Sequence, residues 1–140
     1  MSGVALAAKT LNPSLEVIGV QAKNCAPYVA SLRAGRIVNA RSANTFAEGL
    51  ASKHPTELPF RMISRLVDEV IEVSEEEMRR AVVLLLEKTH NLAEGAGAAG
   101  TAGVVQLHER LAGRKVGTIL SGGNLNRHQL ERALTDPHTW

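Results

Sequence analysis

The sequence predicts an α/β fold, a three-layer αβα arrangement in which helices cover both faces of a short, mainly parallel sheet. Runs of β-branched and apolar residues near Val17, Val70 and Val116 alternate with segments of helical periodicity, the order typical of such folds. The run around Val17 is apolar without alternation, which indicates a strand buried on both faces. Because no repeat or linker interrupts the chain, we expect residues 1–140 to form a single α/β domain.

The composition is ordinary for a soluble globular domain and argues against several classes of partner. Of the 140 residues, 44% are hydrophobic and 21% are charged, and the net charge is only +2. Because the charges are scattered, we expect no nucleic-acid partner. No apolar run is long enough to span a membrane, so no membrane attachment is expected. The single cysteine, Cys25, excludes an internal disulfide and favours a reducing, cytoplasmic setting.

The first part of the chain predicts a helix, a strand and a second helix. Apolar residues recur on one helical face across Ser2 to Leu11, and we expect Ser2 to cap this helix and Asn12 to end it. The run Leu15 to Val20 predicts a strand. Pro27 to Leu32 follows as a short helix that ends at Gly35, since glycine is favoured just past a helix end.

The middle of the chain combines a long connection with a strongly predicted helix. Ile37 to Pro59 is expected to be irregular, and connections of that length are often functional. Phe60 to Leu66 predicts an amphipathic helix, and Val70 to Val73 predicts a strand. Ser74 and Glu77 form a capping-box pattern that opens the next helix. The broad apolar stripe of that helix consists of Met78, Ala81, Val82, Leu85 and Leu86.

The last part of the chain predicts a small-residue helix, a strand and a final helix. Gly95 to Leu111 is helical, and its Gly- and Ala-rich first half permits close packing against a neighbour or a ligand. Lys115 to Leu120 predicts a third strand. Asn126 to Leu134 predicts the last helix, and we expect Asp136 to Trp140 to form a loose tail.

The stretch Ser121-Gly122-Gly123-Asn124 is the candidate binding site that this order indicates. It joins the third predicted strand to the last helix, and ligands of open α/β sheets bind at the carboxyl ends of strands, where helices present free N–H groups. Ser121 offers a hydroxyl group, and the glycines let the backbone approach a ligand closely. An ordinary strand-to-helix turn has the same composition and stays an alternative.

Other chemical patterns in the sequence have structural interpretations. Gly95 to Gly100 matches the dinucleotide fingerprint G-x-G-x-x-G, but no strand leads into it. Close helix packing is therefore the better interpretation, with Glu94 facing a ligand at the helix start. None of the five histidines pairs with another His or a Cys at metal-ligand spacing. Cys25 has Lys23 nearby but no neighbouring His, so an inert thiol is expected.

Several motifs occur together in the order and spacing of one enzyme family. The matching segments are Val17 to Ala22, Asn44 to Ala51, Pro59 to Ser74, Leu84 to Glu87, Ala93 to Ala98 and Leu120 to Asn124. They resemble the second half of the pyridoxal-phosphate-dependent threonine and serine dehydratases, the fold type II enzymes that include serine racemase and tryptophan synthase β-like proteins. The resemblance covers about Ser2 to Leu134 and implies a truncated version of the family's large domain.

The resemblance implies which residues face the cofactor. In the family, the Ser of the Ser-Gly-Gly-Asn stretch hydrogen-bonds the pyridine nitrogen, which assigns that role to Ser121 and places Gly122 next to it. The backbone around Gly49 and the residue Glu94 would lie beside the ring. A hydroxyl at that nitrogen leaves the ring unprotonated, which suits β-elimination better than transamination.

The resemblance also implies that parts of the family's site have no match here. The lysine that holds the cofactor covalently and a Ser-x-Gly-Asn loop belong to the family's amino-terminal half, and a phosphate-binding glycine loop normally precedes the match to Ser2-Gly3-Val4-Ala5. The lysines present match no catalytic position: Lys9, Lys23, Lys53, Lys88 and Lys115. Where some relatives bind a cation through a Glu, this chain has Gln21, followed by Pro27. We therefore expect no catalytic residue, no metal, and weak or absent binding of pyridoxal phosphate.

Two hypotheses about function follow. In the first, the chain is a fragment of a threonine or serine dehydratase, an enzyme of β-elimination to a 2-keto acid, and is inactive alone. In the second, it is a non-catalytic module that binds a small ligand or another protein. Without the rest of the large domain, a sheet edge and the apolar face around Leu85 and Leu86 should be exposed. We therefore expect either a homo-oligomer or a complementary amino-terminal chain that covers them.

Overall fold

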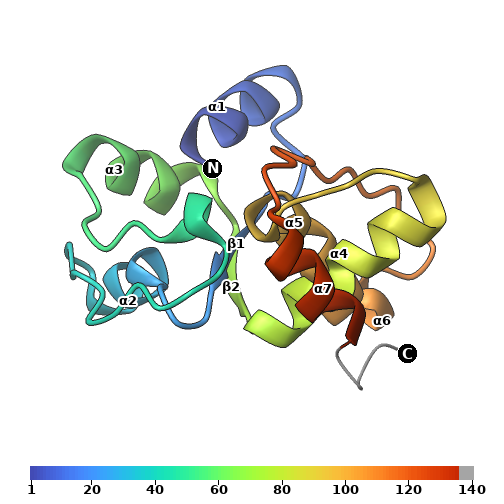
Figure 1. Ribbon diagram of the computed structural model, residues 1–140. Helices are drawn as coiled ribbons and strands as arrows, with labels where there is room; N and C mark the ends of the chain where they lie inside the picture. Colours follow the sequence, from blue (N-terminus) through green and yellow to red (C-terminus); the bar gives the residue numbers. More distant parts are fainter. Residues whose placement is uncertain (136–140) are drawn as a thin grey trace.

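The computed structural model describes residues 1–135, and the predicted tail Asp136 to Trp140 lies outside the described residues (Figure 1). Helices outnumber strands in this part of the chain. Among its helices, none combines the length and the apolar composition that crossing a membrane requires. The elements in chain order are α1 (Ser2–Leu11), β1 (Ile18–Ala22), α2 (Pro27–Ala34), the 3-10 turn η1 (Glu48–Leu50), α3 (Glu57–Leu66), β2 (Glu69–Val73), α4 (Glu75–Thr89), α5 (Gly95–Gln106), α6 (His108–Leu111) and α7 (Arg127–Thr135).

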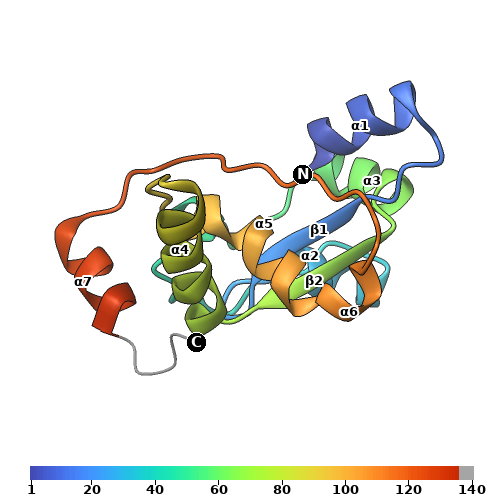
Figure 2. The ribbon, with the colours of Figure 1, turned by 90° about the vertical axis from the view of Figure 1, so that its right-hand side faces the viewer.

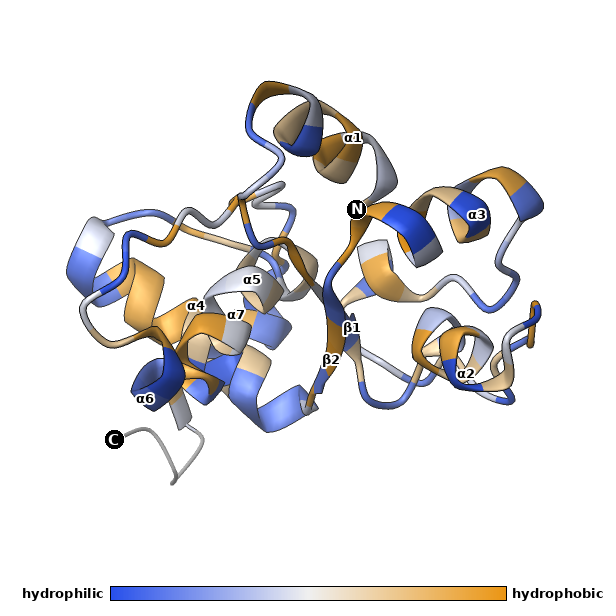
Figure 3. Ribbon diagram, turned by 180° about the vertical axis from the view of Figure 1, so that it is seen from behind, coloured by the Kyte–Doolittle hydropathy of each residue, from blue (hydrophilic) through white to orange (hydrophobic). Residues whose placement is uncertain are grey.

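The sheet consists of β1 and β2, which run parallel in a register from Ile18 opposite Glu69 to Ala22 opposite Val73. Helices α2 and α3 lie on one side of the strands and α4 to α7 on the other, while α1 lies above the strands and packs against α3 (Figure 1). Seen from behind and coloured by hydropathy, the strands carry apolar residues between these two groups of helices (Figure 3). This confirms the predicted fold class, a three-layer α/β arrangement with a small parallel sheet.

The third strand expected near Val116 is not formed. The structure assigns residues 115–120 no strand, and the sheet built by the described residues has only two strands. The reason is pairing: a strand needs backbone partners, and within residues 1–135 no backbone hydrogen bond reaches Lys115 to Leu120. The prediction of this strand was wrong, because it was made from composition, which cannot supply the neighbouring strand.

Several predicted helix boundaries are confirmed by their capping contacts. The Ser74 hydroxyl accepts a hydrogen bond from the Glu77 N–H at 3.1 Å, and the Glu77 carboxylate accepts one from the Ser74 N–H at 2.6 Å, which completes the capping box. Helix α1 ends at Asn12, whose N–H still bonds the helix. Helix α2 ends at Gly35 with φ of 64°, a left-handed conformation that favours glycine.

Other predicted boundaries were wrong. Met1, and not Ser2, is the amino-terminal cap of α1, and it caps without a side-chain hydrogen bond. The expected helix from Gly95 to Leu111 is interrupted at Leu107, where the backbone leaves helical geometry and separates α5 from α6. Helix α3 begins three residues before Phe60, because Thr56 takes the extended backbone of an N-cap.

The core lies where α4 and α5 pack against the sheet, and it is built mostly from small side chains. Met78 and Val82 of α4 and Val73 of β2 are fully buried. Leu85 and Leu86, expected on an exposed face, are half-buried, because α7 packs against α4. Most of the exposed large apolar residues lie on or next to α1 and in the segment after α6, and the others are spread over α3, α7 and the connection before α5. They are Met1, Val4, Leu6, Leu11, Leu15, Leu58, Leu92, Val116, Ile119, Leu120 and Leu134.

Candidate functional site

The amino-terminal end of α5 is the point where separate parts of the chain converge. The 3-10 turn η1 reaches it from one side: a Cβ built on Gly49 would lie 2.9 Å from the Ala96 Cβ. The preceding loop reaches it as well, because a Cβ on Gly95 would lie 2.6 Å from the Phe46 ring and 3.1 Å from the Ala47 Cα. Only glycine at position 95 permits this approach between helix and loop.

The Ser121-Gly122-Gly123 stretch reaches the same helix end from another direction. The Glu94 N–H donates a hydrogen bond to the Gly122 carbonyl at 3.1 Å. The Gly122 carbonyl also lies against Gly97, where a side chain would collide with it. In turn, Gly122 faces the Glu94 carboxylate, and a Cβ on Gly123 would lie 2.5 Å from the Leu92 carbonyl oxygen. The loop is therefore held backbone against backbone.

The structure thus brings the four predicted site residues into one neighbourhood at the start of α5. Gly49 comes from η1, Glu94 is the N-cap of α5, and Ser121 and Gly122 come from the loop before α7. Ser121 is exposed, so its hydroxyl is accessible. Glu94 makes no side-chain capping bond to α5, which leaves the first N–H groups of the helix without a side-chain partner. The role of the four predicted site residues in holding a cofactor stays a prediction.

The glycine pattern at the start of α5 serves close packing, as predicted. Gly95 faces Phe46, Gly97 faces Gly122, and Gly100 faces the Thr118 hydroxyl. No strand leads into the helix, since an irregular stretch from His90 to Glu94 precedes it. The pattern is therefore not a dinucleotide fingerprint in its usual strand-turn-helix setting.

Glu75 is a residue of this neighbourhood that sequence reasoning did not single out. Its Oε2 accepts a hydrogen bond from the Phe46 N–H at 2.9 Å, while its Oε1 is buried without a hydrogen-bond partner in the described structure. The Arg79 guanidinium lies 5.5 Å from the centre of the Phe46 ring. These contacts from α4 fix the loop that carries Gly49. In the sequence, Glu75 is one of three acidic residues in the first turn of a helix, a place where acids are common. Nothing in that pattern indicates its hydrogen bond with the Phe46 N–H.

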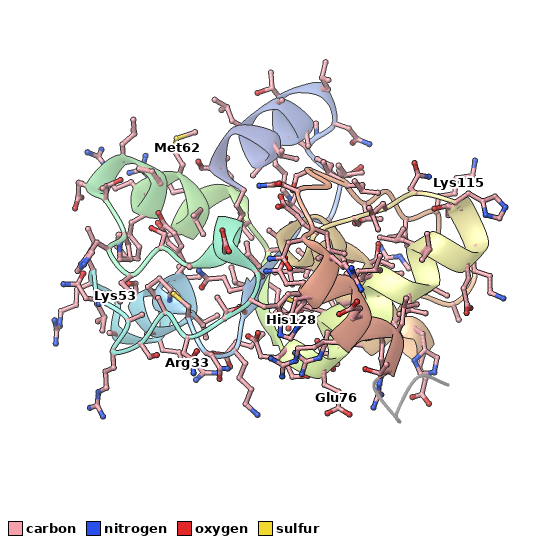
Figure 4. All side chains as sticks on the ribbon, viewed as in Figure 1. Arg33, Lys53, Met62, Glu76, Lys115 and His128 are labelled. Carbon is pink, nitrogen blue, oxygen red and sulfur yellow. The ribbon has the colours of Figure 1, made fainter. Side chains whose placement is uncertain are left out.

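The described lysines do not gather at this neighbourhood. Lys9 on α1 forms an ion pair with Asp68 at 2.7 Å. Lys53 and Lys115 lie at opposite sides of the view in Figure 4. The residues at the start of α5 therefore offer a hydroxyl, a carboxylate and backbone N–H groups, and they offer no amine. This set fits the ring side of pyridoxal phosphate and lacks a group that bonds it covalently.

Gln21, expected to follow the first strand, lies within β1 and has a structural role in this chain. The Gln21 Oε1 accepts hydrogen bonds from the N–H groups of Tyr28 and Val29, at 3.0 and 3.1 Å, and so caps α2. Pro27 is the first residue of that helix. Across residues 1–135, no group of three or more His, Cys, Asp or Glu side chains is placed to hold a metal ion.

Cys25 is buried beside the same turn, and burial raises the pKa of its thiol, with the charge of Lys53 acting weakly in the other direction. A raised pKa means less thiolate at neutral pH, in agreement with the predicted inert thiol. The modulating lysine is Lys53, and not the sequence neighbour Lys23.

Two concave regions of the described structure are lined by residues other than those of this neighbourhood. One, of about 440 Å³, opens along β2 between Arg33 of α2 and Gln106 of α5. Another, of about 280 Å³, lies between α4 and α5 next to Arg80 and His108. Neither region includes Gly49, Glu94, Ser121 or Gly122 in its lining.

Comparison with known proteins identifies the family. Residues 1–122 match the family described as pyridoxal-phosphate dependent enzyme. Over 134 residues the chain is 41% identical to an L-threonine ammonia-lyase of Thermotoga maritima. Its structure is similar to maize serine racemase, with a TM-score of 0.84 and 32% identity, and to a processed threonine deaminase of Solanum lycopersicum, with a TM-score of 0.87 and 27% identity. The chain belongs to the family of pyridoxal-phosphate dependent enzymes.

These matches cover nearly all of this chain but only part of each relative. The Thermotoga match spans 96% of this chain and 33% of that protein. The maize serine racemase match spans 95% of this chain and 42% of that chain, and the Solanum match spans 94% and 39%. The chain therefore corresponds to about a third of the length of the threonine ammonia-lyase it resembles, the carboxyl-terminal portion.

Proposed function

We propose that this chain forms the ring-facing side of the cofactor site of a threonine or serine ammonia-lyase and acts together with a complementary polypeptide. The observation that carries the proposal is the convergence of η1, Glu94 and the Ser121-Gly122 loop at the start of α5. The relatives named above include threonine ammonia-lyase and serine racemase, which supports a hydroxy amino acid as substrate. The reducing cytoplasm is the proposed location, in keeping with the single buried thiol.

Each residue has a distinct part in this proposal. The Ser121 hydroxyl hydrogen-bonds the pyridine nitrogen and, being neutral, does not force a proton onto it. Gly49 and Gly122 present flat backbone surfaces to the ring, because neither carries a side chain. Glu94 orients the loop through its backbone N–H, 3.1 Å from the Gly122 oxygen, and lines the ring edge. When bound, pyridoxal phosphate supplies an electron sink for the α-carbon, which allows the β-hydroxyl to leave.

The chain alone is proposed to be inactive. The residues present provide one hydrogen bond to the ring nitrogen, and a single hydrogen bond contributes about 1 kcal/mol net. Holding a doubly charged phosphate needs several N–H donors or cations, and elimination needs an amine that takes the α-proton. In this proposal the complementary polypeptide supplies both. Pyridoxal phosphate binding by the chain alone is therefore weak or absent.

The test compares the chain alone with a co-expressed pair. The partner is the part of the Thermotoga maritima L-threonine ammonia-lyase that this chain does not match. We expect no keto acid from threonine or serine with the chain alone, and turnover with the pair that falls at least tenfold on Ser121→Ala. Ser64→Ala, on the opposite side of the sheet in α3, is the matched control and should keep full turnover.

Two outcomes would overturn the proposal. Turnover by the chain alone, above the free-cofactor background and lost on Ser121→Ala, would show that it needs no partner. A stable pair without cofactor absorbance would favour a non-catalytic interaction module.

A further inference from the structure

The side of the molecule formed by α2, η1 and α3 is strongly basic. From Lys23 to Arg65 the chain has seven Lys and Arg residues against two acids, a net charge of +5, whereas the rest of the chain carries −3. These elements lie on one side of the strands in Figure 1, and Figure 2, seen from the side of α4, shows α2 behind the strands. All seven cations are exposed, and together we call them the basic face: Lys23, Arg33, Arg36, Arg41, Lys53, Arg61 and Arg65.

The charges of the basic face have no partner in the part of the chain that the structure describes. None of the seven side chains forms an ion pair, a hydrogen bond or an aromatic contact with residues 1–135. Elsewhere, many cations are matched with acids. Ion pairs are formed by Lys9, Arg80, Arg110, Arg114 and Arg127. The basic face therefore offers its charges to a group outside the described chain.

The fold brings together cations that the sequence scatters. The Ala40 N–H donates a hydrogen bond to the Lys53 carbonyl at 2.9 Å, which brings the backbones of Arg41 and Lys53 close together although twelve positions separate them. Arg61 and Arg65 lie four positions apart on α3 and so share one face of that helix. The basic face thus contains closely spaced pairs of cations.

Acidic residues limit how far the basic face extends. Arg33 lines the concave region of about 440 Å³ beside β2 together with Glu69 and Glu72, so negative charge begins where the face meets the sheet. Beyond that border the rest of the chain has an excess of acids. A long polyanion such as a nucleic acid would extend past the face onto this negative surface, whereas a short one contacts the cations alone.

The residue types of the face favour carboxylates over nucleotides. The aromatic residues between positions 23 and 65 are Tyr28, Phe46 and Phe60, and none of them is exposed, so nucleotide bases find no ring on which to stack. Five of the seven cations are arginines, whose planar guanidinium groups bind carboxylates through two parallel hydrogen bonds.

We infer that the basic face binds a short acidic segment of another protein, in which several Asp or Glu residues follow one another closely. Exposed ion pairs are individually weak and are screened by salt, so binding requires several of them at once. The loop that the Ala40–Lys53 hydrogen bond closes also carries Gly49, so a segment bound to Arg41 and Lys53 contacts the connection that leads to the candidate site. The inference does not depend on the proposed function, because neither cofactor nor catalysis enters it.

Fluorescence anisotropy of a labelled peptide of about ten glutamates, titrated with the full chain, tests the inference. We expect saturable binding at about 20 mM salt and at least tenfold weaker binding at about 200 mM salt, because the screening length shortens. Arg41→Gln with Lys53→Gln should weaken binding at least fivefold, and so should Arg61→Gln with Arg65→Gln. All four positions are exposed, so circular dichroism should show an unchanged fold.

Arg127→Gln with Arg132→Gln is the matched control. It removes the same net charge from two exposed positions of α7, outside the basic face, and should change the affinity for the peptide by less than twofold. An equal loss of affinity in the control and in the basic-face variants would show that net charge alone attracts the peptide, which would overturn the inference.

A second probe decides between classes of partner. An RNA duplex of about 20 base pairs that binds more tightly than the peptide, and that loses affinity in the basic-face variants, would assign the face to a nucleic acid and overturn the acidic partner. Absence of peptide binding at low salt would overturn it as well. Tighter binding of the peptide than of the duplex, with the loss confined to the basic-face variants, would support the inference.

Discussion

Strand β1 and the segment Lys115–Leu120 have similar sequences and opposite environments. Both are rich in apolar and β-branched residues, and the same helix, α5, lies against both. Yet β1 is mostly buried and fully paired with β2, whereas every residue of the segment is exposed. The difference shows that β-forming composition becomes a strand only where a neighbour satisfies the backbone.

The entrance to β1 is anchored in a way that the segment is not. The Asp68 Oδ2 accepts hydrogen bonds from the Val17 N–H and the Lys9 ammonium group, both at 2.7 Å. Arg110 of α6 joins Glu16 to Glu69, which ties the beginnings of both strands together. After α6 the Arg114 guanidinium also pairs with the Glu16 carboxylate, at 2.9 Å, but within the described part of the chain no hydrogen bond or ion pair reaches residues 115–120 that follow it. The contrast between the anchored strand and the free segment predicts where substitutions will matter.

The largest effect is expected from truncating the core next to the sheet. Met78→Ala removes a fully buried side chain from α4 and should lower the free energy of unfolding by about 2–5 kcal/mol, the range for buried Leu, Ile or Met. Ile119→Ala in the segment should change it by less than about 0.5 kcal/mol. Urea unfolding of the two variants measures both values. Equal losses would show that the segment is packed in the free chain.

A second pair of variants compares glycines of the two regions. Gly97→Val in α5 would drive a side chain into the Gly122 backbone and should cost about 1–3 kcal/mol. Gly117→Val in the segment meets no atom within 4 Å and should be nearly neutral. Hydrogen exchange at the Glu94 amide reports the local effect, since its acceptor is the Gly122 carbonyl. An unchanged Glu94 amide in Gly97→Val would contradict the described docking of the loop.

A third comparison is between two N-cap residues, Ser74 of α4 and Thr56 of α3. Ser74→Ala removes a capping box and should lower stability by about 1 kcal/mol. Thr56→Ala at the start of α3 removes a side chain that makes no capping bond, so a smaller loss is expected. Thermal unfolding of both variants gives the order. A larger loss for Thr56→Ala would mean that its side chain bonds α3 in solution.

The anchor of β1 predicts a small dependence of stability on pH. The Lys9 ammonium group, followed by the Val17 N–H, lowers the pKa of Asp68 below its usual value of about 3.9. In this pH range the folded state therefore binds fewer protons than the unfolded state. The stabilisation that the Asp68 contacts contribute is fully present above the usual pKa of an aspartate. It is lost as the pH falls through the lowered folded pKa. Asp68 is half-exposed, so solvent screening limits the contribution to about 0.2–1 kcal/mol.

Asp68→Asn should reduce the acid sensitivity of unfolding between about pH 5 and pH 3. Some sensitivity of unfolding to acid should remain, because the pKa of Glu16 is lowered as well. The main cause of that lowering is the hydrogen bond from Arg110. Denaturant midpoints measured across this range give the comparison. Identical pH profiles for the two proteins would show that the anchor is not formed.

Much of this architecture could be predicted from local patterns. The Ser74 capping box and the Gly35 helix end depend on contacts between residues close in sequence, and the strands around Val17 and Val70 were recognised from their apolar composition. The third strand was predicted wrongly, because a strand also requires a backbone partner, and residues 1–135 provide none for residues 115–120. Local signals predict what a segment is able to form, and the pairing decides whether it does.

The Ser121-Gly122 loop could be selected from its place before a helix, but its convergence with Gly49 followed only from the resemblance. Glycine spacing predicted that α5 packs closely against a neighbour, but no rule of spacing joins Gly49 to Ser121 across 72 positions. Glu75 was missed for a related reason. Its carboxylate bonds the Phe46 N–H, 29 residues away, while its place in an acidic first turn already has a local explanation.

The glycines that let α5 approach its neighbours also determine when it forms. Gly95, Gly97, Gly100 and Gly103 each disfavour an isolated helix by roughly 0.5–1 kcal/mol relative to alanine. Helix α4 has a capping box and no glycine, so it depends less on tertiary contacts to form. During refolding, α4 should therefore acquire amide protection first. Helix α5 should follow only when β1 and β2 are in place, which makes the candidate site a late product of folding.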